Sequence, residues 1–170
     1  MDALLVTTRL LHVLLGTFWA GTLIFNALFL VPAIRDAGPD GAKVVAGLMR
    51  RRFLDVMPLV AVLTILSGLW LYWHVSGGFQ PAYMGSSIGM TYGAGALASI
   101  AAFLIGVGVM RPAMLRAAAL TQAAAQAAPA EREAQLAAAQ ALRLRGVTAG
   151  RVVAALLVLA VAAMAVGRYV

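Results

Sequence analysis

The chain of 170 residues contains no cysteine, which excludes disulfides, thiolate metal ligands and iron–sulfur clusters. Any metal or cofactor would be held by histidine, methionine, carboxylate or backbone atoms. Charged residues make up only 11% of the chain, against about a quarter in a typical soluble domain. The six acidic residues lie almost entirely outside the long apolar segments, which argues against a pump that works through intramembrane carboxylates. The motifs of phosphate-binding loops, nucleophile elbows, dinucleotide-binding folds and zinc proteases are absent.

Apolar residues, in contrast, are abundant: they make up 63% of the chain, and the mean hydropathy is +0.93. A window of about 18 or more apolar residues with few charges predicts a transmembrane helix. Four such windows occur, at about residues 4–31, 53–75, 88–110 and 152–166. We therefore expect an all-α integral membrane protein, with residues 1–170 forming one domain, a bundle of four transmembrane helices. Because Arg9 follows an apolar stretch and no small-residue cleavage site is present, we expect the first helix to be retained.

The basic residues predict how the bundle is oriented. Eleven of the thirteen lie in the segments that join helices one and two and helices three and four, which leaves only Arg9 and Arg168 elsewhere. Because basic connections stay in the cytoplasm, we expect an N-out, C-out protein of the bacterial inner membrane. The net charge of +7 then reflects this topology and contact with anionic lipid, and no nucleic-acid partner is expected.

Both cytoplasmic connections are predicted to contain helices. In residues 42–53 the apolar side chains recur at helical spacing, which predicts a short helix in the membrane interface, with Asp40 as its cap. Residues 113–144 are rich in alanine and glutamine and contain one proline, Pro129, which predicts a cytoplasmic helical hairpin with arms at 113–128 and 130–144. The hairpin is either an ordinary connection or a docking surface for a cytoplasmic partner.

The only two histidines lie near the expected outer ends of the first two helices. His12 is 23 residues from Arg35, and His74 is 22 residues from Arg52. At about 1.5 Å per residue each distance is roughly 34 Å, so the two imidazoles lie at one depth if both arginines mark the inner surface. Two such histidines on neighbouring helices predict a shared site for a haem iron or another metal ion. The alternative is that they are polar residues of the interfacial belt.

The residues around the histidines suit a flat macrocycle. Glycines near a ligating histidine let the macrocycle approach the backbone, aromatic rings flank it, and an arginine one turn outward can pair with a propionate. We therefore expect a bis-histidine haem b site near the outer face, formed by His12, His74, Arg9, Gly16, Trp19, Gly68 and Trp70. Met90 is the substitute axial ligand. The same histidines with Met90 or Met84 form the alternative copper site.

Three other intramembrane features lead to predictions about packing. The many glycine and alanine residues of the third helix predict close contact with its neighbours, or room for a ring near Met90. Asp55 is expected to form an ion pair with Arg51 and Arg52 at the inner boundary. Asn26 is expected to form a hydrogen bond between helices, with a substrate contact as the alternative.

Several short motifs resemble a known superfamily: residues 11–13 (LHV), 18–21 (FWAG), 49–53 (MRRRF), 57–58 (MP) and 67–71 (SGLWL). They resemble small bacterial membrane proteins that include the CopD copper-resistance domain, the HemJ-type protoporphyrinogen oxidases and related uncharacterised membrane proteins. The resemblance covers about residues 10–71 and is closest to the uncharacterised branch. A HemJ-like relationship implies a four-helix haem b protein with His12 as a haem ligand. The basic residue late in the first helix and the lysine in a later helix that accompany the oxidase are absent here.

These observations lead us to expect a membrane haem b protein that serves electron transfer, with a quinone or another redox partner, or that handles gas or haem. The alternative is a copper-binding or copper-uptake protein of the CopD type, although its eight methionines are scattered along the chain. A third possibility is a cofactor-free accessory subunit of a homo-oligomer or larger membrane complex. An optical spectrum of the purified protein distinguishes the three.

Overall fold

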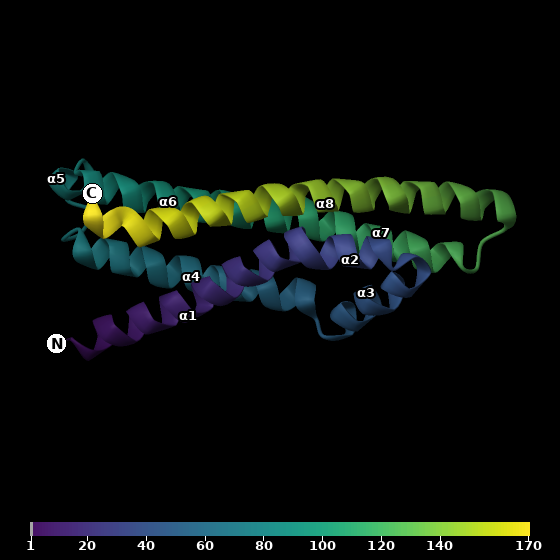
Figure 1. The fold of residues 1–170 in the computed structure, drawn as a ribbon, viewed down its shortest axis with the longest axis horizontal. Helices are drawn as coiled ribbons and strands as arrows, with labels where there is room; N and C mark the ends of the chain where they lie inside the picture. Colours follow the sequence, from purple (N-terminus) through teal and green to yellow (C-terminus); the bar gives the residue numbers. More distant parts are fainter. Residues whose placement is uncertain (1) are drawn as a thin grey trace.

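Four long apolar helices form the body of the protein in the computed structural model, which describes residues 2–170 (Figure 1). They are α1 (Ala3–Phe25), α4 (Phe53–Val75), α6 (Ser87–Ile105) and α8 (Pro129–Val166). The helices alternate in direction, and both chain ends lie at one end of the bundle, here called the terminal end. Each helix, with its continuation, is long and apolar enough to cross a membrane. The expected all-α architecture is confirmed, with four helices long and apolar enough to span a membrane.

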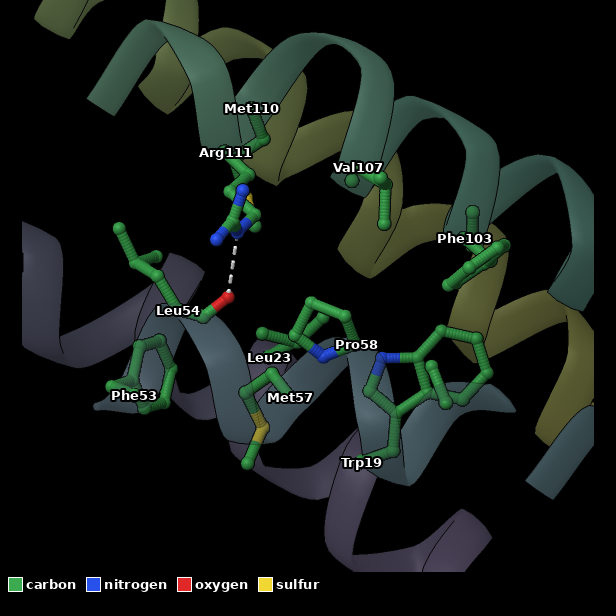
Figure 2. Close-up of a pocket in the computed structure, with 13 residues that line it drawn as sticks. Trp19, Leu23, Phe53, Leu54, Met57, Pro58, Phe103, Val107, Met110 and Arg111 are labelled. Atoms are coloured by element: carbon green, nitrogen blue, oxygen red, sulfur yellow. Dashed lines mark hydrogen bonds between the residues drawn. The ribbon is translucent and has the colours of Figure 1, made fainter. Parts of the chain in front are cut away.

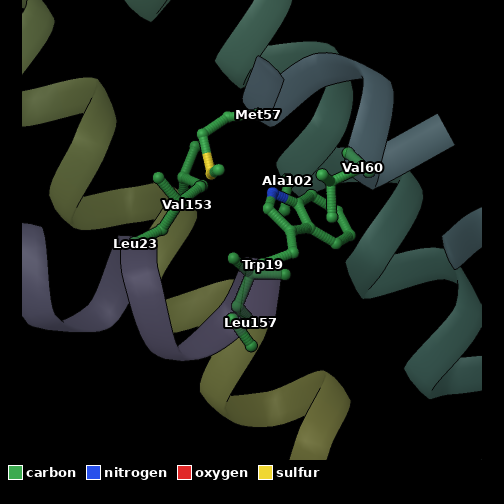
Figure 3. Close-up of a cluster of buried hydrophobic side chains, with 9 residues drawn as sticks. Trp19, Leu23, Met57, Val60, Ala102, Val153 and Leu157 are labelled. Carbon is green, nitrogen blue, oxygen red and sulfur yellow. The ribbon is translucent and has the colours of Figure 1, made fainter. Parts of the chain in front are cut away.

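The four helices form a closed ring around a narrow core. Helix α1 packs against α4 and α8, and α6 packs against the same two helices, so that α1 and α6 are diagonal partners. The core is built around the indole of Trp19 (Figure 3), and its buried members are Trp19, Ala20, Leu23, Met57, Val60, Ala61, Ala102, Val153 and Leu157. Many larger apolar side chains, such as Leu10 and Phe18, lie on the outer surface. Such a surface suits lipid, because a helix satisfies nearly all of its backbone polar groups internally and can present apolar side chains outward.

Two of the four spans contain a π-helical turn directly before a proline. The turn η1 (Asn26–Leu30) precedes Pro32, and the turn η3 (Gly106–Met110) precedes Pro112. A proline ring clashes with the carbonyl four residues earlier, and a wider turn removes this clash. In both cases the amide after the turn bonds to the carbonyl five residues back. Each helix therefore continues past its proline instead of ending there.

The continuation of α1 forms an elbow at the end opposite the termini, here called the basic end. Helix α2 (Val31–Asp36) extends α1, and after the 3₁₀ turn η2 (Gly38–Asp40) helix α3 (Gly41–Arg50) folds back along α2 toward α4 (Figure 1). The predicted short helix in this connection is confirmed. The predicted cap is wrong, because the Asp40 carboxylate makes no capping bond and accepts instead from Lys43 Nζ at 2.7 Å.

The continuation of α6 forms a long hairpin at the basic end. Helix α7 (Arg111–Ala124) packs along the first half of α8, with small buried residues such as Ala117 and Ala139 between them. The predicted helical hairpin is confirmed, but its two arms are continuous with the spans instead of being separate helices. At the terminal end the short helix α5 (Pro81–Met84) packs against α6, and the 3₁₀ turn η4 (Gly167–Tyr169) packs against α6 and α8.

Candidate functional site

His12 lies in the interface between α1 and α4. Its imidazole Nδ1 is 2.9 Å from the carbonyl oxygen of Thr64 and 3.3 Å from Oγ of Ser67. The ring lies against Gly68, where an added Cβ would be only 2.6 Å from Cε1 of His12. A glycine at this position therefore lets the imidazole approach the backbone of α4. Gly68, which the sequence predicts to line a cofactor site, therefore lies beside His12.

The hydrogen bonds of His12 determine its tautomer. The Thr64 carbonyl can only accept, so Nδ1 of His12 carries the hydrogen. The hydroxyl of Ser67 donates to the carbonyl of Leu63 at 2.7 Å and so acts as an acceptor toward the imidazole. In the neutral ring the lone pair is then on Nε2, which makes no hydrogen bond within residues 2–170. A backbone carbonyl that holds Nδ1–H and leaves Nε2 free is the usual arrangement of a metal-ligating histidine.

The structure does not bring His74 to the same place. His74 is six residues beyond Gly68 on α4, which is about 9 Å farther along the helix. It is exposed, and its ring stacks on Trp70 at 5.3 Å between centroids and 15° between planes. A metal ion binds imidazole nitrogens at about 2 Å, so His12 and His74 do not reach one ion. The expected bis-histidine pair is corrected accordingly.

The difference comes from the elbow at the basic end. The prediction of equal depth assumed that Arg35 and Arg52 both lie at the inner surface of the membrane. In the structure Arg35 lies in α2, beyond the core, and α3 then returns over 10 residues toward α4. A helix of this length spans about 15 Å, so Arg52 lies nearer the bundle centre than Arg35 does. The second histidine is therefore displaced toward the terminal end.

The other predicted cofactor residues divide into two groups. Gly16 lies beside His12 in the α1–α4 interface, where an added Cβ would be 3.4 Å from Cγ2 of Thr64. Arg9 is exposed one turn closer to the terminal end and remains near His12. Trp19 is buried in the bundle core, and Trp70 contacts His74 instead of His12. Only Arg9, Gly16 and Gly68 therefore stay in the neighbourhood of the imidazole.

The residues of the alternative copper site are dispersed. Met90 is 59% exposed on α6, the diagonal partner of α1, and Met84 lies in α5. Within residues 2–170 no three histidine or carboxylate side chains are grouped so that they could hold a metal ion. Asn26, predicted to bond between helices, makes no side-chain hydrogen bond in the same range and begins the turn η1.

A polar cluster on α4 was only partly predicted. Pro58 has no N–H, so the carbonyl of Leu54, four residues earlier, loses its helical partner. Nε of Arg111 donates to this carbonyl at 3.0 Å (Figure 2), and Nη2 of the same residue donates to Oδ1 of Asp55 at 2.7 Å. The expected pair of Asp55 with Arg52 is present at 3.6 Å, whereas no pair with Arg51 forms. Pro58 was the signal in the sequence that a carbonyl would need another donor.

A cavity of about 30 Å³ lies beside this cluster (Figure 2). It is lined by residues of α1, α4, the end of α6 and η3, together with Arg111, and its side chains are apolar except at Trp19 and Arg111. Trp19 is 3% exposed and contributes its indole ring to the wall of the cavity. The nitrogen edge of the indole is turned toward Pro58. Sequence reasoning placed Trp19 beside a haem and missed this cavity.

The second half of the bundle repeats the arrangement around His12 with a tyrosine. Tyr92 lies 20 residues before the proline that follows its π-helical turn, as His12 does in the first half. The ring of Tyr92 lies against Gly167, as the ring of His12 lies against Gly68. Each half therefore has one ring packed against a glycine, within α4 for His12 and in the turn η4 for Tyr92, and only the ring of His12 has a nitrogen lone pair.

Comparison with known protein families, curated proteins and solved structures gives no match. The resemblance to CopD and HemJ-like proteins therefore stays a prediction. Among the predicted site residues, His12 is the one whose hydrogen bonds hold the side chain with a free nitrogen lone pair, on Nε2, that could bind a metal.

Proposed function

We propose that this protein binds haem b through one histidine, His12, in the bacterial inner membrane. The observation that supports this proposal is the bond from Nδ1–H to the Thr64 carbonyl, which leaves the Nε2 lone pair available. Gly16 and Gly68 have no side chains, so α1 and α4 pack closely beside the imidazole. Arg9, one turn closer to the terminal end, has the charge needed to pair with a propionate.

The number of protein ligands favours haem over copper. A porphyrin brings four nitrogens of its own, so one imidazole completes a stable site. A copper ion needs several protein ligands, and within residues 2–170 no group of metal-ligating side chains forms around His12. Bound haem would supply a redox-active iron, while the Thr64 carbonyl holds the imidazole ring in its ligating orientation. With His12 as its only protein ligand, a bound haem would suit haem handling or gas binding better than bis-histidine electron transfer.

Spectra of the purified protein, reconstituted with hemin, test this proposal. We expect a Soret band of a five-coordinate, high-spin haem in the wild type and its loss in His12→Ala. His74→Ala is the matched control, because it removes the other histidine without touching the α1–α4 interface, and it should bind haem normally. Equal loss in both variants would contradict the single-histidine site. A wild type that binds neither haem nor copper would favour an accessory subunit.

We further propose that the basic end lies in the cytoplasm and both termini lie outside. The basis is the concentration of basic residues in the α2–α3 elbow and the α7–α8 hairpin. Alkaline phosphatase fused after Val170 should be active, and a fluorescent protein inserted at residues 123–128 should be fluorescent. The reverse pattern would contradict this orientation.

A further inference from the structure

The basic end meets the apolar body of the bundle at a well-defined level. The apolar helix α4 begins at Phe53, directly after Arg52, and α6 with η3 ends directly before Arg111. Nε of Arg111 donates to the carbonyl of Leu54 at 3.0 Å, so these two boundaries lie side by side. In a bilayer, such a boundary lies where the hydrocarbon ends and the headgroups begin. An exposed charged group at this level therefore faces lipid headgroups.

Three consecutive arginines, Arg50, Arg51 and Arg52, join α3 to α4 at this level. All three are exposed. The ion pairs among residues 2–170 involve Lys43, Arg52 and Arg111, so Arg50 and Arg51 have no carboxylate partner in that range. Consecutive Cα atoms are only about 3.8 Å apart, so the chain concentrates like charges here without neutralising them. This cluster, here called the arginine junction, is suited to an anion from outside the chain.

The backbone of Arg52 supports a role for its side chain. Arg52 has a φ of 56° and a ψ of 32°, in the left-handed region. Glycine adopts this conformation without steric cost, whereas arginine does not. The turn at Arg52 connects α3, which folds back along α2, to the start of α4 (Figure 1). A charged side chain on a strained backbone, where glycine would fit better, indicates that the side chain itself is used.

An apolar stripe leads from the arginine junction along the outside of α4. Its members recur at intervals of three or four residues, which places them on one face of the helix, and are Val56, Leu59, Leu63 and Leu66. Their exposed fractions are 41%, 60%, 41% and 58%. From Val56 to Leu66 the stripe is about 15 Å long, about half of the roughly 30 Å of a bilayer's hydrocarbon core. Its length matches one acyl chain in one leaflet.

The arginine junction and the stripe together select the partner. Phosphate oxygens accept paired hydrogen bonds from arginine guanidinium groups, and the stripe contacts hydrocarbon. A soluble anion would leave the stripe unused. A second copy packed on the stripe in the same orientation would bring two arginine junctions together, and like charges across an interface repel. Anionic phospholipids carry both a negative headgroup and acyl chains, and basic residues at the membrane surface attract them.

We propose that the arginine junction binds one anionic phospholipid, such as phosphatidylglycerol. Its phosphate accepts hydrogen bonds from Arg50 and Arg51, with Arg52 beside them, and one of its acyl chains lies along the stripe. Haem binding at His12 has no bearing on this site. The orientation of the bundle has none either, because vesicles of uniform composition offer the same lipid to both ends.

Photocrosslinking shows which lipid lies on the stripe. Leu59 is replaced by the photoreactive residue benzoylphenylalanine, and the protein is reconstituted in vesicles with equal amounts of phosphatidylglycerol and phosphatidylcholine. Mass spectrometry then identifies the crosslinked lipid. Each arginine at a membrane surface contributes about a fivefold preference for anionic lipid, so Arg50 and Arg51 together should give an excess of phosphatidylglycerol of about 25-fold. Equal crosslinking of the two lipids would overturn the proposal.

Variants of the two free arginines test the source of this excess. Arg51→Gln should reduce it to about fivefold, and Arg50→Gln/Arg51→Gln should abolish it. Arg50→Lys/Arg51→Lys keeps both charges and should retain most of the excess, whereas its complete loss would overturn the electrostatic assignment. Arg132→Gln is the matched control, because Arg132 lies 19 residues before Arg151 in α8, about 28 Å farther from the membrane boundary. Loss of the excess in Arg132→Gln would show an effect of net charge alone and overturn the site.

A second crosslinking position serves as a control for the location. Leu59 lies seven residues after Arg52, and Leu104 lies seven residues before Arg111, so the two are at similar depth. Their exposed fractions are 60% and 61%. Arg111 is already paired with a carboxylate, so benzoylphenylalanine at Leu104 should show a much smaller excess of phosphatidylglycerol. The same excess at both positions would indicate a general attraction to the basic end and overturn the assignment to the arginine junction.

Two other occupants give distinct results in the same experiment. A crosslinked protein dimer at Leu59 would place a second copy of the chain on the stripe and overturn the lipid assignment. Glycerol 1-phosphate carries the phosphate without acyl chains, and at constant ionic strength it should not reduce crosslinking to phosphatidylglycerol. Displacement of the lipid by glycerol 1-phosphate would mean that the arginine junction binds soluble phosphates, and would overturn the role of the stripe.

Discussion

The contact between Arg111 and the Leu54 carbonyl leads to a sharp prediction about stability. Pro58 cannot donate to this carbonyl, and Nε of Arg111 takes over at 3.0 Å. Arg111→Met removes the donor and leaves a carbonyl unpaired in an apolar helix, which costs about 1–3 kcal/mol. We therefore expect Arg111→Met to destabilise the bundle by at least this amount, with the loss of the Asp55 contact added to it.

The role of Pro58 makes the prediction specific. Pro58→Ala restores an N–H that can pair with the Leu54 carbonyl within α4. In the Pro58→Ala background, Arg111→Met should lower the free energy of unfolding by about 1–3 kcal/mol less than it does in the wild type, because the Leu54 carbonyl then has a donor within α4. The coupling between Arg111 and Asp55 should be the same in both backgrounds, since that contact does not involve Pro58.

Reversible unfolding in mixed micelles, followed by circular dichroism, measures these differences. The four proteins of the cycle are the wild type, the two single variants and the double variant. Effects that add within about 0.5 kcal/mol would show that Arg111 does not serve the Leu54 carbonyl. A larger loss in the Pro58→Ala background would refute the reasoning as well.

Three further predictions follow from single contacts. Gly68→Ala should displace the His12 ring from the Thr64 carbonyl, because the new Cβ would lie 2.6 Å from Cε1 of His12. The free energy of unfolding should fall by about 1 kcal/mol. Gly21→Ala is the control, because a Cβ there meets nothing within 4 Å. Burial, followed by the neighbouring Tyr92 and Tyr72, raises the pKa of Tyr83 above 10.0. The folded state therefore favours the neutral phenol, so its contribution to stability is complete below pH 10.0 and is lost as the pH rises through the raised pKa. Tyr83→Phe should flatten an alkaline unfolding titration in that window. Arg52 has a φ of 56°, the left-handed region, and Arg52→Gly should relieve roughly 1 kcal/mol of strain in thermal unfolding, whereas Arg51→Gly should not.

The amino-acid sequence by itself determined the class of the fold and the positions of its helices. Long apolar windows and proline positions are local signals, so the span 53–75 was predicted with the bounds that α4 has. The alanine-rich hairpin was predicted for the same reason, because helix propensity depends on nearby residues. The sequence also singled out His12 as a ligand candidate, since histidine is rare in this chain.

Only the tertiary structure decided which residues meet. The levels of His12 and His74 depend on how α3 folds back against α2, and no count along the chain contains that information. Arg111 lies 57 residues from Leu54 in the sequence. The position of Pro58 indicates that the Leu54 carbonyl lacks its helical donor, but it does not indicate which residue will donate instead. The turn η3 adds one residue to a helical turn and so changes the direction in which Arg111 projects. Contacts between distant helices depend on such rotations and offsets, which hydrophobic periodicity does not encode.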